Sequence, residues 1–309
     1  MRIVCDIPHS QGFDNGCVVT IGNFDGVHLG HQMVIRNLLK QSQKLGLPAV
    51  IVLFEPHPLE YFNRDDAPAR LTSLREKISQ LGMWSVDLVM VLRFGKQLAD
   101  LEPEDFVIRY LVEGLKVRWL LVGDDFRFGR RRRGDFKLLQ SLGAEYGFVA
   151  DDSETLLHNG QRISSTAIRH ALKAGDFDSA KNLLGRAYSV CGRVIYGDGR
   201  GRQLGFPTAN IQLRRIKTAL RGVFAITAVG VSRKPVPGVA NLGVRPTVDG
   251  GQHVSLEAHL FDFDQDLYGQ QVEIIFHQRI REERAFASLD ELTLQIEKDV
   301  AQARQLLAV

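Results

Sequence analysis

The chain has 309 residues, 44% of them hydrophobic and 24% charged, which is enough for two globular domains with ordinary cores. A formal net charge of only +3 gives no reason to expect a nucleic-acid or acidic-membrane partner, whereas phosphorylated substrates are compatible with it. The three cysteines lie far apart without metal-ligand spacing, which argues against a disulfide framework or a zinc site. The longest apolar run is too short to cross a bilayer, so we expect a cytoplasmic location.

A buried strand, a glycine-containing turn and a helix organise the first part of the chain. Residues 17–21 are apolar or β-branched and predict a buried parallel strand, and apolar residues at helical spacing over 29–44 predict a helix that Gly46 ends. His28 and His31 lie three apart at the helix start, so both rings can project from one side, where free N–H groups attract anions. This pattern favours a site for a nucleotide α-phosphate, although both histidines could simply decorate a helix start.

Strands and helices alternate after this turn, which predicts a mainly parallel, Rossmann-like sheet. We expect strands at 49–54, 86–92, 119–122 and 148–150, and helices at 73–81, 103–115 and 136–146. The loop 122–129, which contains Asp125 and Phe126, is a second candidate ligand loop because it also follows a strand. The arginines at 130–133 are typical of a solvated basic run, but beside a phosphate site they could screen polyphosphate charge.

A second candidate phosphate motif, Ile-Ser-Ser-Thr-Ala-Ile-Arg, occupies residues 163–169 at a predicted helix start. Ser164 could simply cap the helix, or the hydroxyls, the helix amides and Arg169 could hold the β- and γ-phosphates and the leaving pyrophosphate. The helical segment 167–184 is expected to end at Gly185, where short β-rich runs separated by glycine and proline begin. We therefore place a domain boundary there, giving domains 1–184 and 185–309.

The second domain reads as a small antiparallel β-barrel closed by a helix. Strands are expected at 187–195, 223–231, 237–242, 254–260 and 272–276, with a final helix at 288–307. The helix carries an apolar stripe that we expect to pack on the barrel: Leu289, Leu292, Ile296, Val300 and Leu307.

The first loop of this domain, residues 196–205, is rich in glycine and arginine and could cradle phosphates. It leads into Phe-Pro-Thr-Ala-Asn at 206–210. If this stretch is extended, Thr208 and Asn210 point to the same face and offer two oxygens to one Mg²⁺. An ordinary turn is the alternative, since proline, threonine and asparagine are common turn residues.

These motifs resemble a known family when they are taken together. Residues 22–31 and 163–169 resemble the H-x-G-H and I-S-S-T-x-I-R signatures of nucleotidyltransferases, and residues 205–210 resemble the G-x-P-T-A-N signature of riboflavin kinases. Residues 238–247, 256–261 and 281–286 extend the second likeness. The whole chain thus resembles the bacterial bifunctional riboflavin kinase/FMN adenylyltransferases. The resemblance implies an α/β Rossmann-like nucleotidyltransferase domain followed by a small antiparallel β-barrel riboflavin kinase domain with a C-terminal helix.

The resemblance also implies two reactions that both use Mg²⁺. Riboflavin and ATP give FMN and ADP, and FMN with a second ATP gives FAD and pyrophosphate. His28 and His31 would stabilise the adenylyl transfer, and Glu257 would be the general base for the ribityl 5′-hydroxyl. Glu257 could otherwise be a simple exposed strand carboxylate. The implied nucleotide and phosphate residues are Gly22, Asn23, Phe24, Asp25, Gly26, Ser164, Ser165, Thr166, Arg169, Gly199, Gly201 and Arg202. The implied flavin residues are Asp125, Phe126, Asn241, Arg281 and Phe286, and the implied metal ligands are Thr208 and Asn210.

One departure and two rival functions follow from the same residues. Asp198 stands in the glycine-rich loop where the family frequently has lysine, which reduces the local positive charge. One rival is a flavin-responsive regulator that binds RNA or protein through residues 130–133. The other is an adenylyltransferase for another phosphorylated metabolite, such as nicotinamide mononucleotide or phosphopantetheine. The intact catalytic motifs and the kinase-like second domain favour the bifunctional enzyme, with riboflavin, FMN and ATP as partners and no nucleic acid or membrane.

Overall fold

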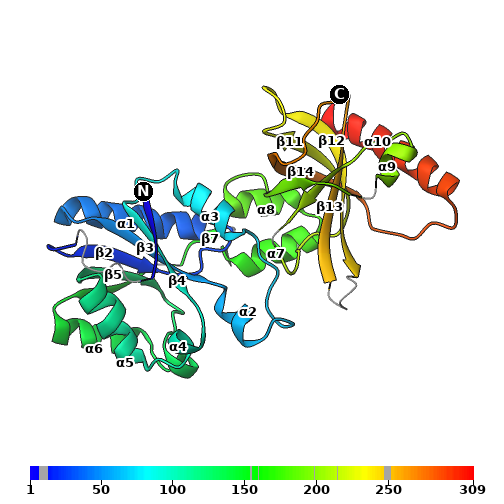
Figure 1. Cartoon of the computed structure of the whole chain (residues 1–309). Coiled ribbons are helices and arrows are strands. Elements are labelled where there is room, and N and C mark those ends of the chain that lie inside the picture. The colour runs from blue at the N-terminus through cyan, green and yellow to red at the C-terminus, as the bar shows by residue number, and fades with distance from the viewer. Residues whose placement is uncertain (7–12, 154, 159, 198, 214, 247–251) are drawn as a thin grey trace. The chain divides into compact units, whose positions relative to one another are not determined.

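The computed structural model describes residues 1–6, 13–153, 155–158, 160–197, 199–213, 215–246 and 252–309 (Figure 1). The chain folds into two compact units, Met1–Pro68 with Lys77–Ile163, and Ala69–Glu76 with Ser164–Val309. Residues 164–184 therefore group with the second unit by their contacts. The predicted boundary at 184/185 marks the change in sequence character, and as a domain boundary it stays a prediction. Asp198 and Thr247, which belong to the sequence motifs discussed above, lie outside the described residues.

The first unit is built on a six-stranded sheet in the order β1-β4-β3-β2-β5-β6, and every pairing in it is parallel. The Rossmann-like prediction is thereby confirmed. Every residue of the central strand β2 is buried, as its apolar sequence predicts. The edge strand β1 was not predicted, because it has only four residues and most of them are exposed. The strands are β1 (Arg2–Cys5), β2 (Cys17–Ile21), β3 (Ala49–Glu55), β4 (Leu88–Arg93), β5 (Val117–Gly123) and β6 (Val149–Ser153).

Helices and short turns connect these strands. Helix α1 ends as predicted, because Gly46 takes a left-handed conformation with φ of 65° and its N–H donates to the Ser42 carbonyl. The predicted helix 103–115 is instead a short α-helix continued by a π-helical stretch. The elements are α1 (Leu29–Leu45), α2 (Pro58–Phe62), α3 (Leu74–Leu81), α4 (Lys96–Ala99), α5 (Pro103–Phe106), η1 (Val107–Gly114), η2 (Arg130–Arg132) and α6 (Phe136–Tyr146), with the hairpin β7 (Leu157–His158) and β8 (Gln161–Arg162).

The second unit contains two helices before the barrel, α7 (Ser165–Ala174) and α8 (Phe177–Leu184), where the sequence predicted one. Gly175, with φ of 80°, ends α7, and the Asp176 carboxylate accepts the Ser179 N–H at 2.9 Å to start α8. This cap also lowers the pKa of Asp176, through hydrogen bonds from the Ser179 side chain and backbone. A glycine followed by a capping residue is therefore enough to break a continuous helical pattern.

The barrel that follows is closed, with its six strands in the order β10-β13-β12-β11-β14-β9 and all pairings antiparallel. The predicted small barrel is confirmed, and its added strand, β10, shows that the 206–210 region leads into an extended segment. The elements are β9 (Ser189–Ile195), α9 (Arg200–Gln203), β10 (Ala209–Gln212), β11 (Gly222–Val229), β12 (Val236–Pro246), β13 (Gln252–Leu260), β14 (Gln271–Arg281) and α10 (Leu289–Leu307).

Helix α10 packs on the barrel through its later turns. Ala303 is fully buried against Val223, Val239 and Phe261 of the barrel, and Val300 and Leu307 adjoin this cluster. Leu289 is 68% exposed, so its predicted place in the packing stripe was wrong, because it begins the helix before the turns that meet the strands. In the described parts of the chain, no helix combines the length and apolar character that crossing a bilayer requires.

The segment 69–76 belongs with the barrel because it is bound there by a buried ion pair. Arg215 Nη2 lies 2.5 Å from Glu76 Oε2, and both side chains are almost fully buried. Arg215 Nη1 also donates to the Tyr188 hydroxyl at 2.8 Å. A buried charge is tolerated when its partner and additional hydrogen bonds compensate the lost hydration, and this network supplies both.

Candidate active sites

The first candidate site is the turn between β2 and α1. The backbone passes through left-handed conformations at Phe24 (φ 47°), Gly26 (φ 86°) and Val27 (φ 41°). Gly26 thus serves the turn as predicted, whereas Gly22 does not need positive φ and instead gives room to the Phe24 ring, 3.1 Å from where a Cβ would stand. Left-handed non-glycine residues cost about 1–3 kcal/mol each and cluster at functional sites. The turn therefore has the strained geometry of a ligand-binding segment.

The two histidines lie together at the start of α1. His28 is the N-cap, and its Nδ1 accepts the His31 backbone N–H at 3.3 Å. The two rings stack with centroids 3.6 Å apart, which confirms that both lie on one side of the helix start. Burial, followed by the positive potentials of His28 and Lys77, holds the pKa of His31 well below its ordinary value. The His31 ring is consequently neutral near physiological pH.

Two buried polar atoms of this turn have no hydrogen-bond partner among the described residues. They are Nδ1 of His31 and Oδ1 of Asn23. Asp25 and His28 are also buried, each with 6% of its surface exposed. Buried polar atoms almost always find a partner, so two unsatisfied atoms within one motif indicate a place for a polar ligand.

A cluster of aromatic rings lies at the carboxyl ends of the neighbouring strands, and sequence reasoning missed most of it. Phe94 follows β4 and contacts Phe54 of β3 at 5.9 Å and Phe62 of α2 at 5.7 Å, between ring centroids. Phe126 and Phe128 follow β5 and stack 5.5 Å apart. Phe62 is 64% exposed, which is unusual for a large apolar ring. A sequence signal did exist, namely a phenylalanine at the end of each of these strands. Phe128 is buried in the core of the first unit and Phe54, Phe94 and Phe126 pack against that core, so Phe62 is the exposed ring of this group.

The polar residues around that cluster are paired with one another. Arg162 Nη2 lies 2.8 Å from Asp124 Oδ1 and 3.5 Å from Asp125 Oδ2, which places Asp125 at the rim of the β5 loop. Arg130 and Arg133 both form ion pairs with Glu102. Half of the arginine run is thus engaged in surface ion pairs, in agreement with the solvated interpretation.

The motif at 163–169 starts α7, in the second unit. Ser164 is the N-cap, and its Oγ accepts the Ala167 N–H at 3.2 Å. This hydroxyl therefore caps the helix, which is one of the two roles considered from the sequence. Ser165 and Thr166 occupy the first turn of the helix. The Arg169 Nε donates to the Ala69 carbonyl at 2.6 Å, which fixes the base of the guanidinium.

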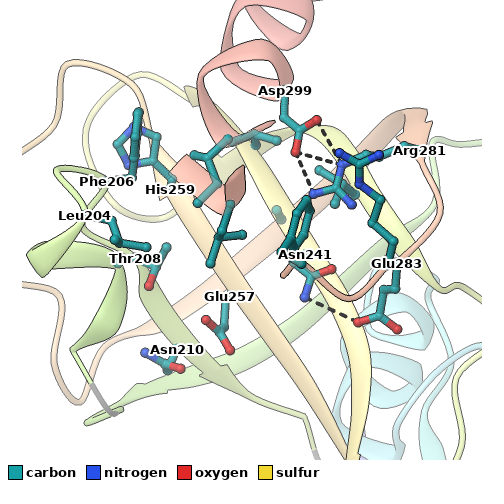
Figure 2. A pocket seen from close by; sticks show the side chains of 18 of the residues that line it. Leu204, Phe206, Thr208, Asn210, Asn241, Glu257, His259, Arg281, Glu283 and Asp299 are labelled. Atoms are coloured by element: carbon teal, nitrogen blue, oxygen red, sulfur yellow. Dashed lines mark hydrogen bonds and ion pairs between the residues drawn. The ribbon is translucent and has the colours of Figure 1, made fainter. Parts of the chain in front are cut away.

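The second candidate site is a cavity of about 330 Å³ in the barrel unit, shown in Figure 2. Strand register places Asn210 of β10 opposite Glu257 of β13, and Glu257 opposite Asn241 of β12. Three polar side chains therefore lie in one row across three adjacent strands, and all three line the cavity. Glu257 is half-buried, and Ser255 Oγ donates to its Oε1 at 3.4 Å, so it is not a simple exposed strand carboxylate.

The glycine-rich loop touches the same row directly. A Cβ on Gly197 would lie 2.1 Å from Asn210 Nδ2, and one on Gly201 would lie 3.0 Å from Thr208 Oγ1. A Cβ on Gly201 would also lie 2.4 Å from the Phe206 carbonyl oxygen, a backbone atom, so this close approach requires glycine. Thr208 and Asn210 both line the cavity; Asn210 lies within strand β10, whereas Thr208 directly precedes that strand.

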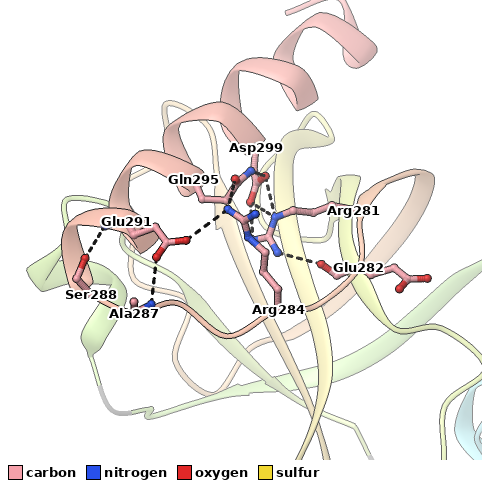
Figure 3. A network of polar contacts seen from close by, with 8 residues as sticks. All are labelled: Arg281, Glu282, Arg284, Ala287, Ser288, Glu291, Gln295 and Asp299. Carbon is pink, nitrogen blue, oxygen red and sulfur yellow. Dashed lines mark hydrogen bonds and ion pairs between the residues drawn. The ribbon is translucent and has the colours of Figure 1, made fainter.

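The far wall of the cavity is a hydrogen-bonded network around Asp299 of α10 (Figure 3). Arg281 Nε lies 3.0 and 2.9 Å from the two Asp299 carboxylate oxygens, and Gln295 Nε2 donates to Oδ1 at 2.8 Å. The guanidinium groups of Arg281 and Arg284 lie 5.5 and 4.8 Å from the centre of the Phe286 ring. Because Asp299 balances the charge of Arg281, this arginine shapes the wall rather than supplying a free cation.

A second cavity of about 460 Å³ adjoins the first through a shared residue. Thr208 lines both, and the lining of the second also includes Arg202, Pro207 and the segment 263–268. Tyr268 in its wall stacks on Tyr196 with ring centroids 3.9 Å apart. Gly199 and Gly201 line the first cavity, so the predicted phosphate loop contributes to both.

Comparison with known proteins identifies the family. A family model described as FAD synthetase matches residues 10–167, and one described as riboflavin kinase matches residues 184–307. The curated bifunctional riboflavin kinase/FMN adenylyltransferase of Escherichia coli K12 is 48% identical, over 97% of this chain and 96% of its own length. The chain belongs to the bifunctional riboflavin kinase/FMN adenylyltransferase family. The Pseudomonas fluorescens member is 47% identical over 100% of this chain and 98% of its own.

A solved structure shares the architecture. A crystal structure described as a macrolide-efflux protein from Streptococcus pneumoniae matches 97% of both chains with a TM-score of 0.77 and 28% sequence identity. The likeness extends over both the FAD synthetase and the riboflavin kinase parts of the present family member.

Several residues of the riboflavin kinase part were not anticipated as cavity residues from sequence. His259, Leu292, Ile296 and Asp299 line the first cavity together with the predicted Asn241, Arg281 and Phe286. Asp299 reads as an ordinary surface aspartate in an amphipathic helix, yet only 3% of it is exposed. Its spacing of four residues from Gln295 is the one local signal that the two could act together.

Proposed function

We propose that this family member makes FMN from riboflavin and ATP in the barrel cavity, and FAD from FMN and a second ATP at the turn between β2 and α1. The observation that carries the proposal is the Asn210–Glu257–Asn241 row, because it sets a carboxylate beside oxygen ligands inside a cavity of ligand size. The family of the chain and the geometry of the histidine turn support the second reaction.

The kinase step divides between the two cavities. Riboflavin occupies the first, where Val223, Val239 and Phe286 offer apolar and aromatic contact to the isoalloxazine ring. ATP occupies the second cavity, and the shared residue Thr208 marks where its γ-phosphate meets the flavin. Glu257 accepts the proton of the ribityl 5′-hydroxyl as that oxygen attacks the γ-phosphorus, and ADP leaves.

Magnesium fits the residues next to that junction. Thr208 and Asn210 offer a hydroxyl and an amide oxygen, the hard donors that Mg²⁺ prefers. In the described parts of the chain, no cluster of three histidine, cysteine or acidic side chains could hold a metal. This agrees with an ion whose ligands are mainly ATP phosphates. Bound Mg²⁺ neutralises phosphate charge during transfer. The contribution of this chain is to present the two oxygens to the same cavity.

The adenylyl transfer uses the histidine turn. A phosphate oxygen of FMN attacks the α-phosphorus of ATP and pyrophosphate leaves, while His28, His31 and the N-terminal amides of α1 stabilise the developing charge. His31 is neutral and still donates one N–H. The unsatisfied Asn23 and His31 atoms support this assignment. Residues 22–26 contact the nucleotide, and Asp125 and Phe126 hold the flavin. From its sequence motif, the helix start with Ser164, Ser165, Thr166 and Arg169 is proposed to bind β- and γ-phosphates.

We place both activities in the cytoplasm. ATP is available there, and reduced thiols are the rule. Cys5, Cys17 and Cys191 are all unpaired, and burial raises the pKa of Cys17 to about 12, which makes its thiol inert.

A chromatographic assay tests the proposed function. Purified protein with riboflavin, ATP and MgCl₂ is expected to accumulate FMN and then FAD, and protein supplied with FMN is expected to form FAD and pyrophosphate. Parallel reactions with nicotinamide mononucleotide and with phosphopantetheine are expected to give no adenylylated product. Adenylylation of either metabolite in preference to FMN would overturn the flavin assignment.

A further inference from the structure

His259 lies between the catalytic row and the segment that presents the magnesium ligands. It is two residues beyond Glu257 on β13 and therefore projects from the same strand face into the cavity. The β10–β13 register pairs Asn210 with Glu257 and Ala209 with Ala258. Continued by one step, this register sets His259 across from Thr208, and Figure 2 shows the His259 ring on that side of the cavity.

The ring makes one directional contact with the segment before β10. His259 Nδ1 lies 2.9 Å from the Pro207 carbonyl oxygen. A carbonyl can only accept, so Nδ1 carries the proton and donates. The ring also meets Phe206 edge-on at 5.5 Å and Phe261 at 5.9 Å, which fixes its orientation.

Thr208 depends on this contact for its position more than Asn210 does. Asn210 lies within β10 and is held by the pairings of that strand with both β13 and β9. Thr208 precedes β10, in the segment 206–208 that follows the left-handed Gly205. The Pro207 carbonyl belongs to the peptide unit that leads directly into Thr208, so a bond to that oxygen restrains the Thr208 backbone.

We propose that His259 is a positioning residue of the riboflavin kinase step, whose Nδ1–H holds the Pro207 carbonyl and so sets the Thr208 hydroxyl beside Asn210 for the magnesium–nucleotide complex. The inference rests on the proposed function for the identity of that complex. It assigns no proton transfer to the imidazole, because the donated hydrogen bond is the whole of its contribution.

Two substitutions separate the hydrogen bond from the packing of the ring. His259→Asn places an amide N–H close to the position of Nδ1 and is expected to keep the bond. His259→Phe keeps a ring against Phe206 and Phe261 but has no donor. Hydrogen–deuterium exchange of the ligand-free protein is expected to show faster exchange at Thr208 and Ala209 in His259→Phe, by about three- to tenfold for the loss of one hydrogen bond, and near wild-type exchange in His259→Asn.

Kinase assays test whether the hydrogen bond, rather than the packing of the ring, matters for FMN formation. The Mg²⁺ concentration for half-maximal FMN formation is expected to rise by about three- to tenfold in His259→Phe and to stay near wild type in His259→Asn. His277→Phe is the matched control, since its ring nitrogen lies 2.8 Å from Thr227 Oγ1 on a barrel strand outside the cavity. Circular dichroism and the urea unfolding midpoint of each variant report on folding of the barrel.

Unchanged exchange at Thr208 and Ala209 in His259→Phe would overturn the proposal, as would an Asn variant as impaired as the Phe variant. The second outcome would assign the effect to the ring itself. Failure of the proposed function is a separate result, because wild-type protein would then make no FMN while the exchange experiment would still report on the bond to Pro207.

Discussion

The two candidate sites are built in opposite ways. The histidine turn is local, since Asn23, His28 and His31 belong to one short stretch and their geometry follows from a single turn and a single helix start. The barrel site is distributed over β10, β12, β13, β14 and α10, and strand register alone brings Asn210, Glu257 and Asn241 into one row. A slip of one residue in either pairing would turn these side chains to the other face of the sheet. A local site thus tolerates change elsewhere in the fold, whereas a register-built site depends on the whole barrel.

The largest expected effect tests whether the barrel row acts through its carboxylate. Glu257→Gln keeps shape and hydrogen bonding but cannot accept the hydroxyl proton, so FMN formation is expected to fall by about 10²–10⁴-fold. FAD formation from supplied FMN should be retained. Glu273→Gln is the matched control, because it is also a half-buried strand carboxylate that accepts from a serine hydroxyl, Ser189 Oγ at 2.6 Å, outside the cavity. FMN formation by Glu257→Gln at the rate of this control would remove Glu257 from the catalytic group.

The next effect tests the independence of the histidine turn. His28→Asn retains a side chain able to cap α1, so its effect on FAD formation reports on the imidazole rather than on the helix. We expect FAD formation from FMN to fall by about 10²–10³-fold, as for the loss of one transition-state donor, and likewise for His31→Ala. Riboflavin phosphorylation should continue in both variants. The exposed His170 of α7 provides the control substitution, His170→Ala. The measurement is steady-state product analysis, started separately from riboflavin and from FMN. Loss of both products in one variant would contradict the division of labour between the two sites.

A smaller effect is expected at the wall of the barrel cavity. Asp299→Asn removes the ion-pair partner of Arg281, whose guanidinium lies against the Phe286 ring. The position of that ring is then less firmly fixed, while Glu257 is unchanged. We expect the KM for riboflavin to rise by about tenfold, equivalent to about 1.4 kcal/mol, with a smaller change in kcat. Asp262→Asn is the control, because it also releases an arginine, Arg304, that stacks on a phenylalanine, but at an exposed position outside the cavity. An unchanged KM would show that the wall does not contact the flavin.

The smallest effect concerns the pH dependence of stability and sharpens the account of the histidine turn. Because the folded-state pKa of His31 lies well below its ordinary value, the unfolded chain binds more protons as the pH falls below about 6.5. The free energy of unfolding is therefore expected to fall over that range, by at most about 1.4 kcal/mol per pH unit from this group.

The test compares wild type with His31→Gln in urea unfolding between pH 7.5 and 5.5. The variant should lose less stability over this range. The pKa of His277 is also lowered, mainly by burial and also by Lys181, and because both proteins contain His277 its contribution cancels in the comparison. Equal pH dependence in the two proteins would show that His31 is not held neutral by its surroundings.

Much of the fold was predictable because its signals are local. Strand β2 and helix α1 have the predicted starts, and Ser288 caps α10 by accepting the Glu291 N–H at 3.1 Å. Errors occurred where local patterns were ambiguous or short. The edge strand β1 is too short to show alternation, and Gly175 with the capping Asp176 broke a helical pattern that looked continuous.

The sequence by itself indicated the histidine pair, because both residues belong to one helix start, and the family resemblance added Thr208, Asn210 and Glu257 as motif residues. The tertiary structure decided which distant residues join them. Asp299 became part of a cavity wall and His259 a partner of Pro207 only when α10 and β13 met the rest of the barrel. The aromatic cluster likewise formed from rings at the ends of separate strands. Periodicity specifies which face a side chain takes, whereas pairing register and helix docking specify what that face meets.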